Sequence, residues 1–195
     1  MSIQRAWSRS FATTLALVLA ASYVIAADEK ETREVAVKDI KLTIPKGWKQ
    51  EEPSSKLRVA QFKIAAADGD KEAAELAINQ FGGGGGGVDE NVKRWVNQFS
   101  AKDRKVKVTK GKSSQGEYVV VDATGTHNRP DGPPFAQKTI PVAGQRMLAV
   151  MLMTGENGSY FLKLTGPEKT VTGAADDLRK AFGAKAEDEK EQKTE

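Results

Sequence analysis

The chain contains a single histidine, His127, and no cysteine. Histidine is the side chain best suited to proton transfer near neutral pH. A serine–histidine–aspartate hydrolase built on this chain would therefore have to use His127, with Asp122 or Asp131 orienting the ring. The sequence lacks the G-x-S-x-G segment that commonly presents such a serine. We therefore predict no catalytic residues, and we interpret His127 as a surface or strand-end side chain that can contribute to binding.

The same composition limits metal chemistry. Without cysteine and with one histidine, thiolate sites and multi-histidine sites cannot form. The segment Asp68-Gly69-Asp70 lacks the further ligands of a calcium loop and is typical of a turn. Met147, Met151 and Met153 lie in an apolar segment, and we interpret them as core residues rather than copper ligands. We predict neither a metal site nor a cofactor.

Six consecutive glycines, Gly82–Gly87, stand between an expected strand and an expected helix, where phosphate-binding loops occur. A P-loop would require Lys-Ser/Thr after the glycines, but Val88-Asp89-Glu90 follows, and its two carboxylates would repel a phosphate. A flexible connector is the plain interpretation, and a mobile flap over a neighbouring site is the alternative. The candidate binding residues in this region are Gly84, Gly85, Arg94 and His127.

The chain has only a small excess of positive charge, with a formal net charge of +4. The densest basic stretch, Lys102–Lys112, holds six basic residues and one acid. It is typical of an edge strand whose lysines prevent pairing between molecules, and contact with an anionic polymer or with lipid headgroups is the alternative. Because the charge is small and no aromatic residues are interleaved with the lysines, we predict no nucleic-acid binding.

These residues must be positioned by strands and two helices. Apolar and polar residues alternate at strand spacing in the segments 40–44, 57–65, 74–81, 116–126 and 159–165. Residues 145–154 are apolar on both faces, which predicts a strand at the centre of a sheet. Residues 88–99 and 171–182 have the spacing of amphipathic helices. The order of these segments predicts an α+β fold, a largely antiparallel sheet with two amphipathic helices packed on it.

Two further segments are expected to lack regular secondary structure. Residues 129–144 hold four of the seven prolines and are predicted to form a long, irregular loop. Residues 27–183 are expected to form a single domain, and residues 184–195 a charged, disordered tail.

The N-terminus has the three parts of a cleavable export signal. Arg5 and Arg9 precede an apolar run over residues 11–26, which ends in small residues. This run is shorter than a spanning helix needs, because a bilayer requires about 20 apolar residues. We therefore expect residues 1–26 to be a signal peptide cleaved after Ala26. The mature chain is then not membrane-spanning and is exported to a periplasmic or extracellular location.

Two segments carry a resemblance to PsbP-like domains. IKLTIPKGW at residues 40–48 resembles the opening strand and P-x-G-W turn of that fold, and GSYFLKLTGP at residues 158–167 is similar to its closing strand. The chain also resembles a family of uncharacterised exported bacterial proteins through VAQF at 59–62, the glycine loop, NVKRWVNQF at 91–99 and KLTGP at 163–167. The resemblance spans residues 35–183 and implies a PsbP-like sandwich that acts as an accessory or binding module. No functional residue carries over from it.

Together these observations favour an exported, non-catalytic binding or accessory domain of the cell envelope, whose partner is an unknown protein or envelope component. Two alternatives stay open. One is a hydrolase that assembles carboxylates around His127 in the folded chain. The other is an envelope-structural protein that binds anionic polymer through its basic stretch.

Overall fold

The computed structural model describes residues 30–81, 85–132, 138–155 and 158–192. The predicted signal peptide and Gly84 lie outside the described residues. Neither helix within these ranges has the length and hydrophobicity required to cross a bilayer.

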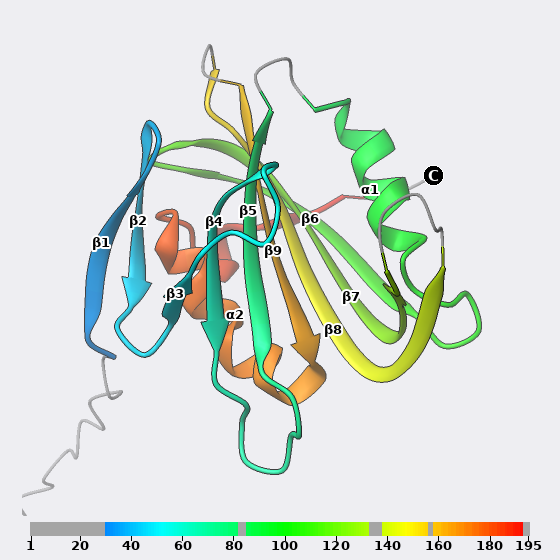
Figure 1. Ribbon diagram of the computed structural model, residues 1–195. Coiled ribbons are helices and arrows are strands. Elements are labelled where there is room, and N and C mark those ends of the chain that lie inside the picture. The colour runs from blue at the N-terminus through cyan, green and yellow to red at the C-terminus, as the bar shows by residue number, and fades with distance from the viewer. Residues whose placement is uncertain (1–29, 82–84, 133–137, 156–157, 193–195) are drawn as a thin grey trace, which may run out of the picture.

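The described residues form a large antiparallel sheet and two helices (Figure 1). The spatial order of its eight strands is β10 (Lys190–Glu191), β6 (Lys105–Ser113), β7 (Gly116–Pro130), β8 (Thr139–Met153), β9 (Ser159–Pro167), β5 (Ala74–Phe81), β4 (Arg58–Ile64) and β3 (Lys49–Glu51). The sheet is open, with β10 and β3 at its edges. The helices are α1 (Val88–Val96) and α2 (Glu168–Ala181). The predicted α+β fold with a largely antiparallel sheet is confirmed.

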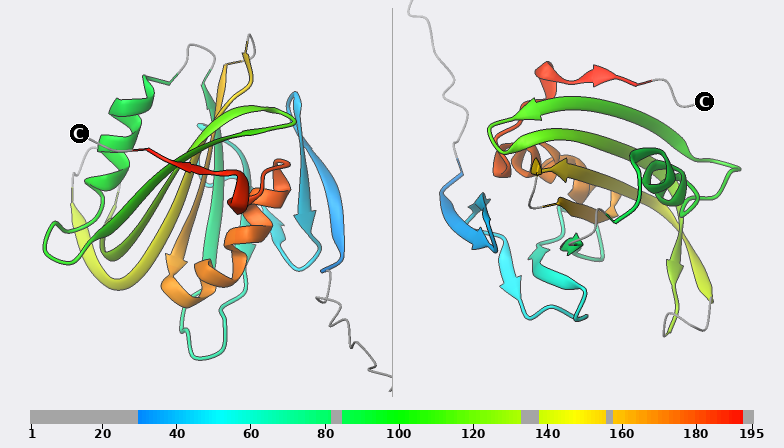
Figure 2. Two further views of the ribbon diagram at one scale, coloured as in Figure 1. Left: turned by 180° about the vertical axis from the view of Figure 1, so that it is seen from behind. Right: turned by 90° about the horizontal axis from the view of Figure 1, so that it is seen from above.

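The sheet is buried on both faces, and each face has its own apolar cluster. Along β8, Leu148, Val150 and Leu152 join the cluster that α2 covers, whereas Met147 and Met151 join the cluster under α1. In the view from behind, α2 lies in front of the strands (Figure 2, left). The prediction of a central strand buried on both sides is therefore confirmed, and so is the assignment of Met147 and Met151 to the core.

A second, two-stranded sheet completes the α2 side. It consists of β1 (Thr32–Val37) and β2 (Ile40–Pro45), which pair as an antiparallel hairpin. The alternation over residues 40–44 predicted β2, whose Ile40, Leu42 and Ile44 are buried in the α2 cluster. Its partner β1 was not predicted.

The arm formed by the ends of β7 and β8 is a correction to the expected loop over residues 129–144. Asn128 pairs with Pro141, Arg129 with Ile140, and Pro130 with Thr139. These pairs extend beyond β6 and β9, so the arm is a two-stranded ribbon. Residues 98–100 contact β7 only as far as Asn128, so Pro130 and Pro141 lie at its open edges. Prolines are tolerated at such edges because no further strand needs their missing N–H.

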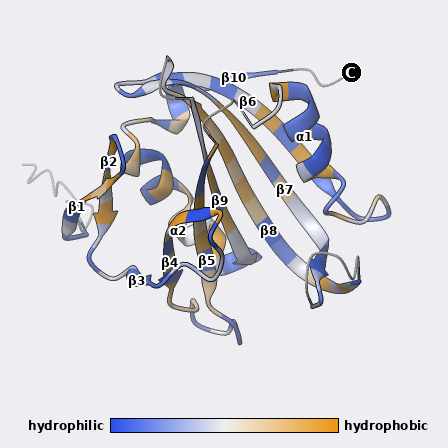
Figure 3. Cartoon of the chain, turned by 45° about the horizontal axis from the view of Figure 1, so that its top comes forward, coloured by the Kyte–Doolittle hydropathy of each residue, from blue (hydrophilic) through white to orange (hydrophobic). Residues whose placement is uncertain are grey.

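The tail is a second correction. Residues 186–191 form a short 3-10 helix, η3 (Ala186–Asp188), and the strand β10, where disorder was expected. The Glu189 carboxylate accepts hydrogen bonds from Arg179 at 2.6 and 3.2 Å and from Thr109 at 2.7 Å. Figure 3 shows β10 as hydrophilic, so these polar contacts, rather than apolar burial, hold the segment against the domain.

This contact generates a stability prediction. The Arg179 and Glu189 side chains are only 10% and 5% exposed. We expect Glu189→Ala to lower the free energy of unfolding by about 3 kcal/mol, because it leaves the Arg179 charge buried without its partner. Urea denaturation followed by circular dichroism measures the change. The control Glu191→Ala removes an exposed carboxylate and should stay within about 0.5 kcal/mol of the wild type. Equal effects of the two substitutions would contradict an ordered tail.

Candidate functional site

The glycine loop is tied to α1 by one buried side chain, Asn91. Its amide donates hydrogen bonds to the backbone carbonyls of Gly85 at 3.1 Å and Gly87 at 2.8 Å, and its Oδ1 accepts one from Arg94. Gly85 has a φ of +61°, and a Cβ there would approach the Phe161 ring to 2.7 Å, so a glycine is required. Two of the predicted binding residues, Gly85 and Arg94, are therefore brought together by a residue that the sequence analysis did not single out.

The central side chain of this region is Lys163, in the middle of β9. Its cross-strand neighbours are Ala149 on β8, a member of the α1 cluster, and Ala77 on β5, so Lys163 points to the α1 side of the sheet. The Lys163 Nζ donates a hydrogen bond of 3.2 Å to the Gln98 side chain. Burial lowers the pKa of the Lys163 amine, and the charges of Arg58 and Arg94 lower it further, whereas Glu75 opposes them.

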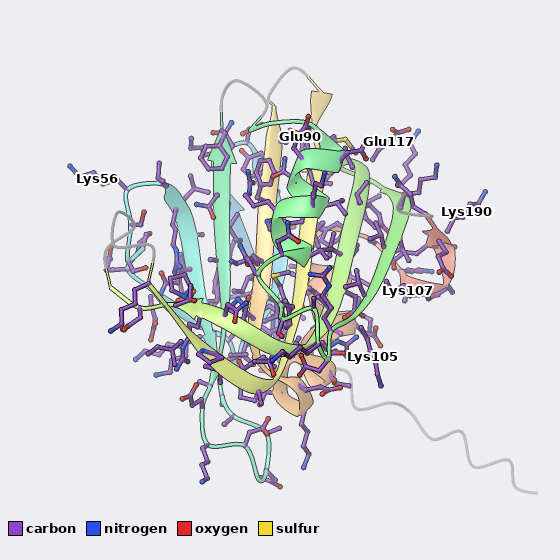
Figure 4. The ribbon with its side chains drawn as sticks, turned by 90° about the vertical axis from the view of Figure 1, so that its right-hand side faces the viewer. Lys56, Glu90, Lys105, Lys107, Glu117 and Lys190 are labelled. Carbon is purple, nitrogen blue, oxygen red and sulfur yellow. The ribbon has the colours of Figure 1, made fainter. Side chains whose placement is uncertain are left out.

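Around Lys163 the sheet changes from apolar to polar. Arg58 on β4 forms an ion pair of 2.9 Å with Glu75 on β5, and a hydrogen bond of 2.7 Å with Gln61. Beyond Phe161 the α1 side of β9 carries Lys163 and Thr165, although their neighbours on β8, Ala149 and Met147, still belong to the apolar cluster. We call this region the α1 polar face. Its members are Arg58, Glu75, Arg94, Gln98, His127, Lys163 and Thr165. Figure 4 looks onto this side of the sheet, with α1 in front of the strands.

His127 is not at the surface, which corrects that part of the prediction. It lies near the end of β7, just after an irregularity between Gly125 and His127, and it is 5% exposed. Its ring stacks on Phe99, with centroids 5.0 Å apart. Burial, followed by the charges of Lys163 and Arg129, lowers the pKa of His127 to about 4, so the ring is neutral at pH 7.

Two buried polar atoms of the α1 polar face have no hydrogen-bond partner among the described residues, the Nε2 of His127 and the Oγ1 of Thr165. Thr165 lies opposite Glu75 and two residues from Lys163, on the same side of β9. Most buried polar atoms in folded proteins are hydrogen-bonded. The two unpartnered atoms lie on the same face of the sheet as the poorly solvated amine of Lys163.

The carboxylates considered for a catalytic triad are engaged elsewhere. Asp122 accepts two hydrogen bonds from Arg146, at 2.9 and 2.7 Å, and its cross-strand neighbour Leu148 belongs to the α2 cluster. Asp131 pairs with Lys138 at 2.7 Å. Neither carboxylate contacts His127 in the described part of the chain. Within the described residues, neither aspartate is therefore placed to orient the His127 ring.

Within the described ranges, no group of three or more histidine, aspartate or glutamate residues could hold a metal ion. A cavity of about 370 Å³ lies at the C-terminal end of α2, between Asp176, Arg179 and residues 183–187. The candidate binding residues that the structure describes, Gly85, Arg94 and His127, do not line it.

No protein-family model and no curated protein sequence matches this chain. The function is therefore inferred from the side chains of the site.

The burial of His127 predicts a dependence of stability on pH. Because the pKa is about 4 in the folded chain and 6.5 ordinarily, the unfolded chain binds more protons between these values. The contribution of the neutral His127 ring to the free energy of unfolding is therefore fully present above pH 6.5, and it is lost as the pH falls toward 4. Between pH 7 and pH 5 we expect a loss of about 2 kcal/mol from this group. Urea denaturation at the two pH values measures it.

The control for this prediction is His127→Phe, which keeps an aromatic ring against Phe99 but cannot be protonated. The variant should lose about 2 kcal/mol less than the wild type over the same pH interval. An identical pH dependence in both proteins would show that His127 is not buried as a neutral ring.

Proposed function

We propose that this chain is an exported, non-catalytic binding domain of the cell envelope that holds an anionic ligand on the α1 polar face. The observation that carries the proposal is the environment of Lys163. Its amine is poorly solvated and lies within electrostatic range of two guanidinium groups, and two buried polar atoms on the same face of the sheet have no partner among the described residues.

The charges of the α1 polar face are unbalanced. Glu75 is paired with Arg58, and no carboxylate of the described residues lies within ion-pair distance of Arg94 or Lys163. The pKa of the Lys163 amine is lowered for the same reason that an anion is favoured there. Burial removes water from the charged form, and the charges of Arg58 and Arg94 outnumber the opposing charge of Glu75. A carboxylate or phosphate group would supply that counter-ion and charge-assisted hydrogen bonds.

The neighbouring groups give the site a polar but uncharged part. The neutral His127 ring and the Thr165 hydroxyl can each exchange one hydrogen bond with a ligand. A ligand that combines an anionic group with a hydroxyl or amide therefore fits better than a bare anion. The resemblance to PsbP-like domains, which serve as accessory or binding modules, and the export signal expected over residues 1–26 support a role in the envelope.

The single histidine makes binding easy to observe. The imidazole protons of His127 give one pair of ring signals in the proton NMR spectrum, because the chain has no other histidine. We expect these signals to shift on titration with inorganic phosphate or citrate at pH 7. Lys163→Gln should weaken the apparent affinity about tenfold or more, because a hydrogen bond to a charged group contributes about 1.5–3 kcal/mol.

Lys107→Gln is the matched control, since it removes one exposed lysine on β6, away from the α1 polar face. It should leave the titration unchanged. The proposal fails if the His127 signals do not respond to either anion, or if Lys163→Gln and Lys107→Gln give the same titration curve as the wild type.

A further inference from the structure

The β6 edge of the sheet carries a second, separate set of charges. Lys105, Lys107, Lys110 and Lys112 are all exposed. Within the described ranges none of them forms an ion pair. Figure 4 places Lys105 and Lys107 along the outer edge of the sheet, on the same side of the picture as Lys190 of β10. This surface lies outside the α1 polar face.

The edge already accepts a strand, the chain's own C-terminal segment. Lys190 pairs with Lys110 and Glu191 with Thr109, and the backbone N–H of Gln192 donates to the Val108 carbonyl at 2.8 Å. The segment is acidic, with Glu187, Asp188, Glu189 and Glu191 in the described residues. The structure therefore contains an example of an acidic extended segment bound to this edge.

This pairing is short and contains an electrostatic conflict. Only two residue pairs form, and one of them sets Lys190 directly opposite Lys110. Like charges directly opposite each other in an antiparallel pair are destabilising. The β10 strand is therefore a weak occupant, in contrast to the Glu189 contact that precedes it.

We propose that the β6 edge, Lys105–Lys112, is a strand-addition site for an acidic extended segment of a partner protein, which displaces β10. The partner's backbone pairs with β6, as in β-augmentation. Its carboxylates lie opposite the unpaired lysines, including Lys110, where the chain's own tail presents another lysine.

The backbone geometry of β6 makes the proposal testable at one residue. The Val108 carbonyl points to β10, and in a strand alternate residues direct their N–H and C=O groups to the same side. The N–H of Val106 therefore points to the open edge, not to β7. Proline at position 106 removes a group needed only by an added strand, and prolines are tolerated at such edge positions.

The probe is a fluorescein-labelled peptide with the sequence of residues 185–195 and the change Lys190→Glu, measured by fluorescence anisotropy with the full chain. We expect Val106→Pro to bind it about fivefold or more weakly than the control Val106→Ala, because one backbone hydrogen bond contributes about 1 kcal/mol. Gln192→Pro in the protein removes the N–H that holds β10 and should tighten peptide binding. Lys190→Glu in the protein places a carboxylate opposite Lys110 and so strengthens the pairing of β10 with β6. This variant should therefore bind the peptide more weakly.

A second readout does not depend on any variant being folded. The Val106 amide of the wild type should exchange its hydrogen more slowly when the peptide is added, as followed by NMR. A scrambled peptide of the same composition and polyglutamate serve as charge controls. The proposal is overturned if Val106→Pro and Val106→Ala bind the peptide equally, or if the Val106 amide is not protected. It is also overturned if polyglutamate displaces the peptide from wild type and Val106→Pro alike, since the lysines would then act as a charge patch for anionic polymer.

Discussion

The constraint on which the structure depends is the burial of its central strands on both faces. β8 places apolar side chains alternately to either side, and β9 adds Tyr160, Leu162 and Leu164 to one side and Phe161 to the other, so each face must be covered by other elements. On one side α2 and the β1–β2 hairpin provide it, and the cluster there extends across β4, β5, β7, β8 and β9. On the other side α1 covers a smaller cluster, with Phe161 as its contribution from β9. The α1 polar face begins where that cover ends.

This boundary explains why a lysine stands on a central strand. Lysine is rarely buried unless it is paired, and Lys163 lies between two strands that contribute to the apolar cluster on the other side of the sheet. Its aliphatic stem can lie along the sheet while the amine reaches Gln98. The cost of withdrawing the amine from water is offset only in part by that neutral hydrogen bond. An anionic ligand would complete the offset, and the domain can then act by binding, without any chemical step.

The local pattern of the sequence was sufficient to predict most strands and both helices. Apolar side chains that alternate, or that recur every three to four residues, lie on the one face of a strand or helix that packs against another element. The pattern could not predict which segments meet across the sheet. Residues 129–144 contain too many prolines to resemble a strand, yet residues 128–130 pair with residues 139–141. The tail has too few apolar residues to suggest order, yet Glu189 contacts Arg179 on the preceding helix and Thr109, which is distant in sequence.

In the site, too, local patterns identified some residues, whereas contacts between distant segments could not be predicted. Arg94 and Gly85 were singled out from the glycine loop, and Asn91 joins them. The burial of His127 depends on the irregularity in β7 and on Phe99, which no local pattern reveals. Lys163 was missed, although a signal was present. In SYFLKLT the side that begins with Phe161 continues with Lys163, and a strand expected next to a central one should not carry an isolated lysine on a covered face.

The most direct test of the central claim is the titration of the Lys163 amine itself, observed by NMR of lysines labelled with carbon-13 at Cε. The structure predicts that the Lys163 signal titrates at a lower pH than those of the exposed lysines of β6, and that saturating phosphate raises its pKa. A Lys163 signal that titrates together with the exposed lysines and does not respond to phosphate would contradict the account.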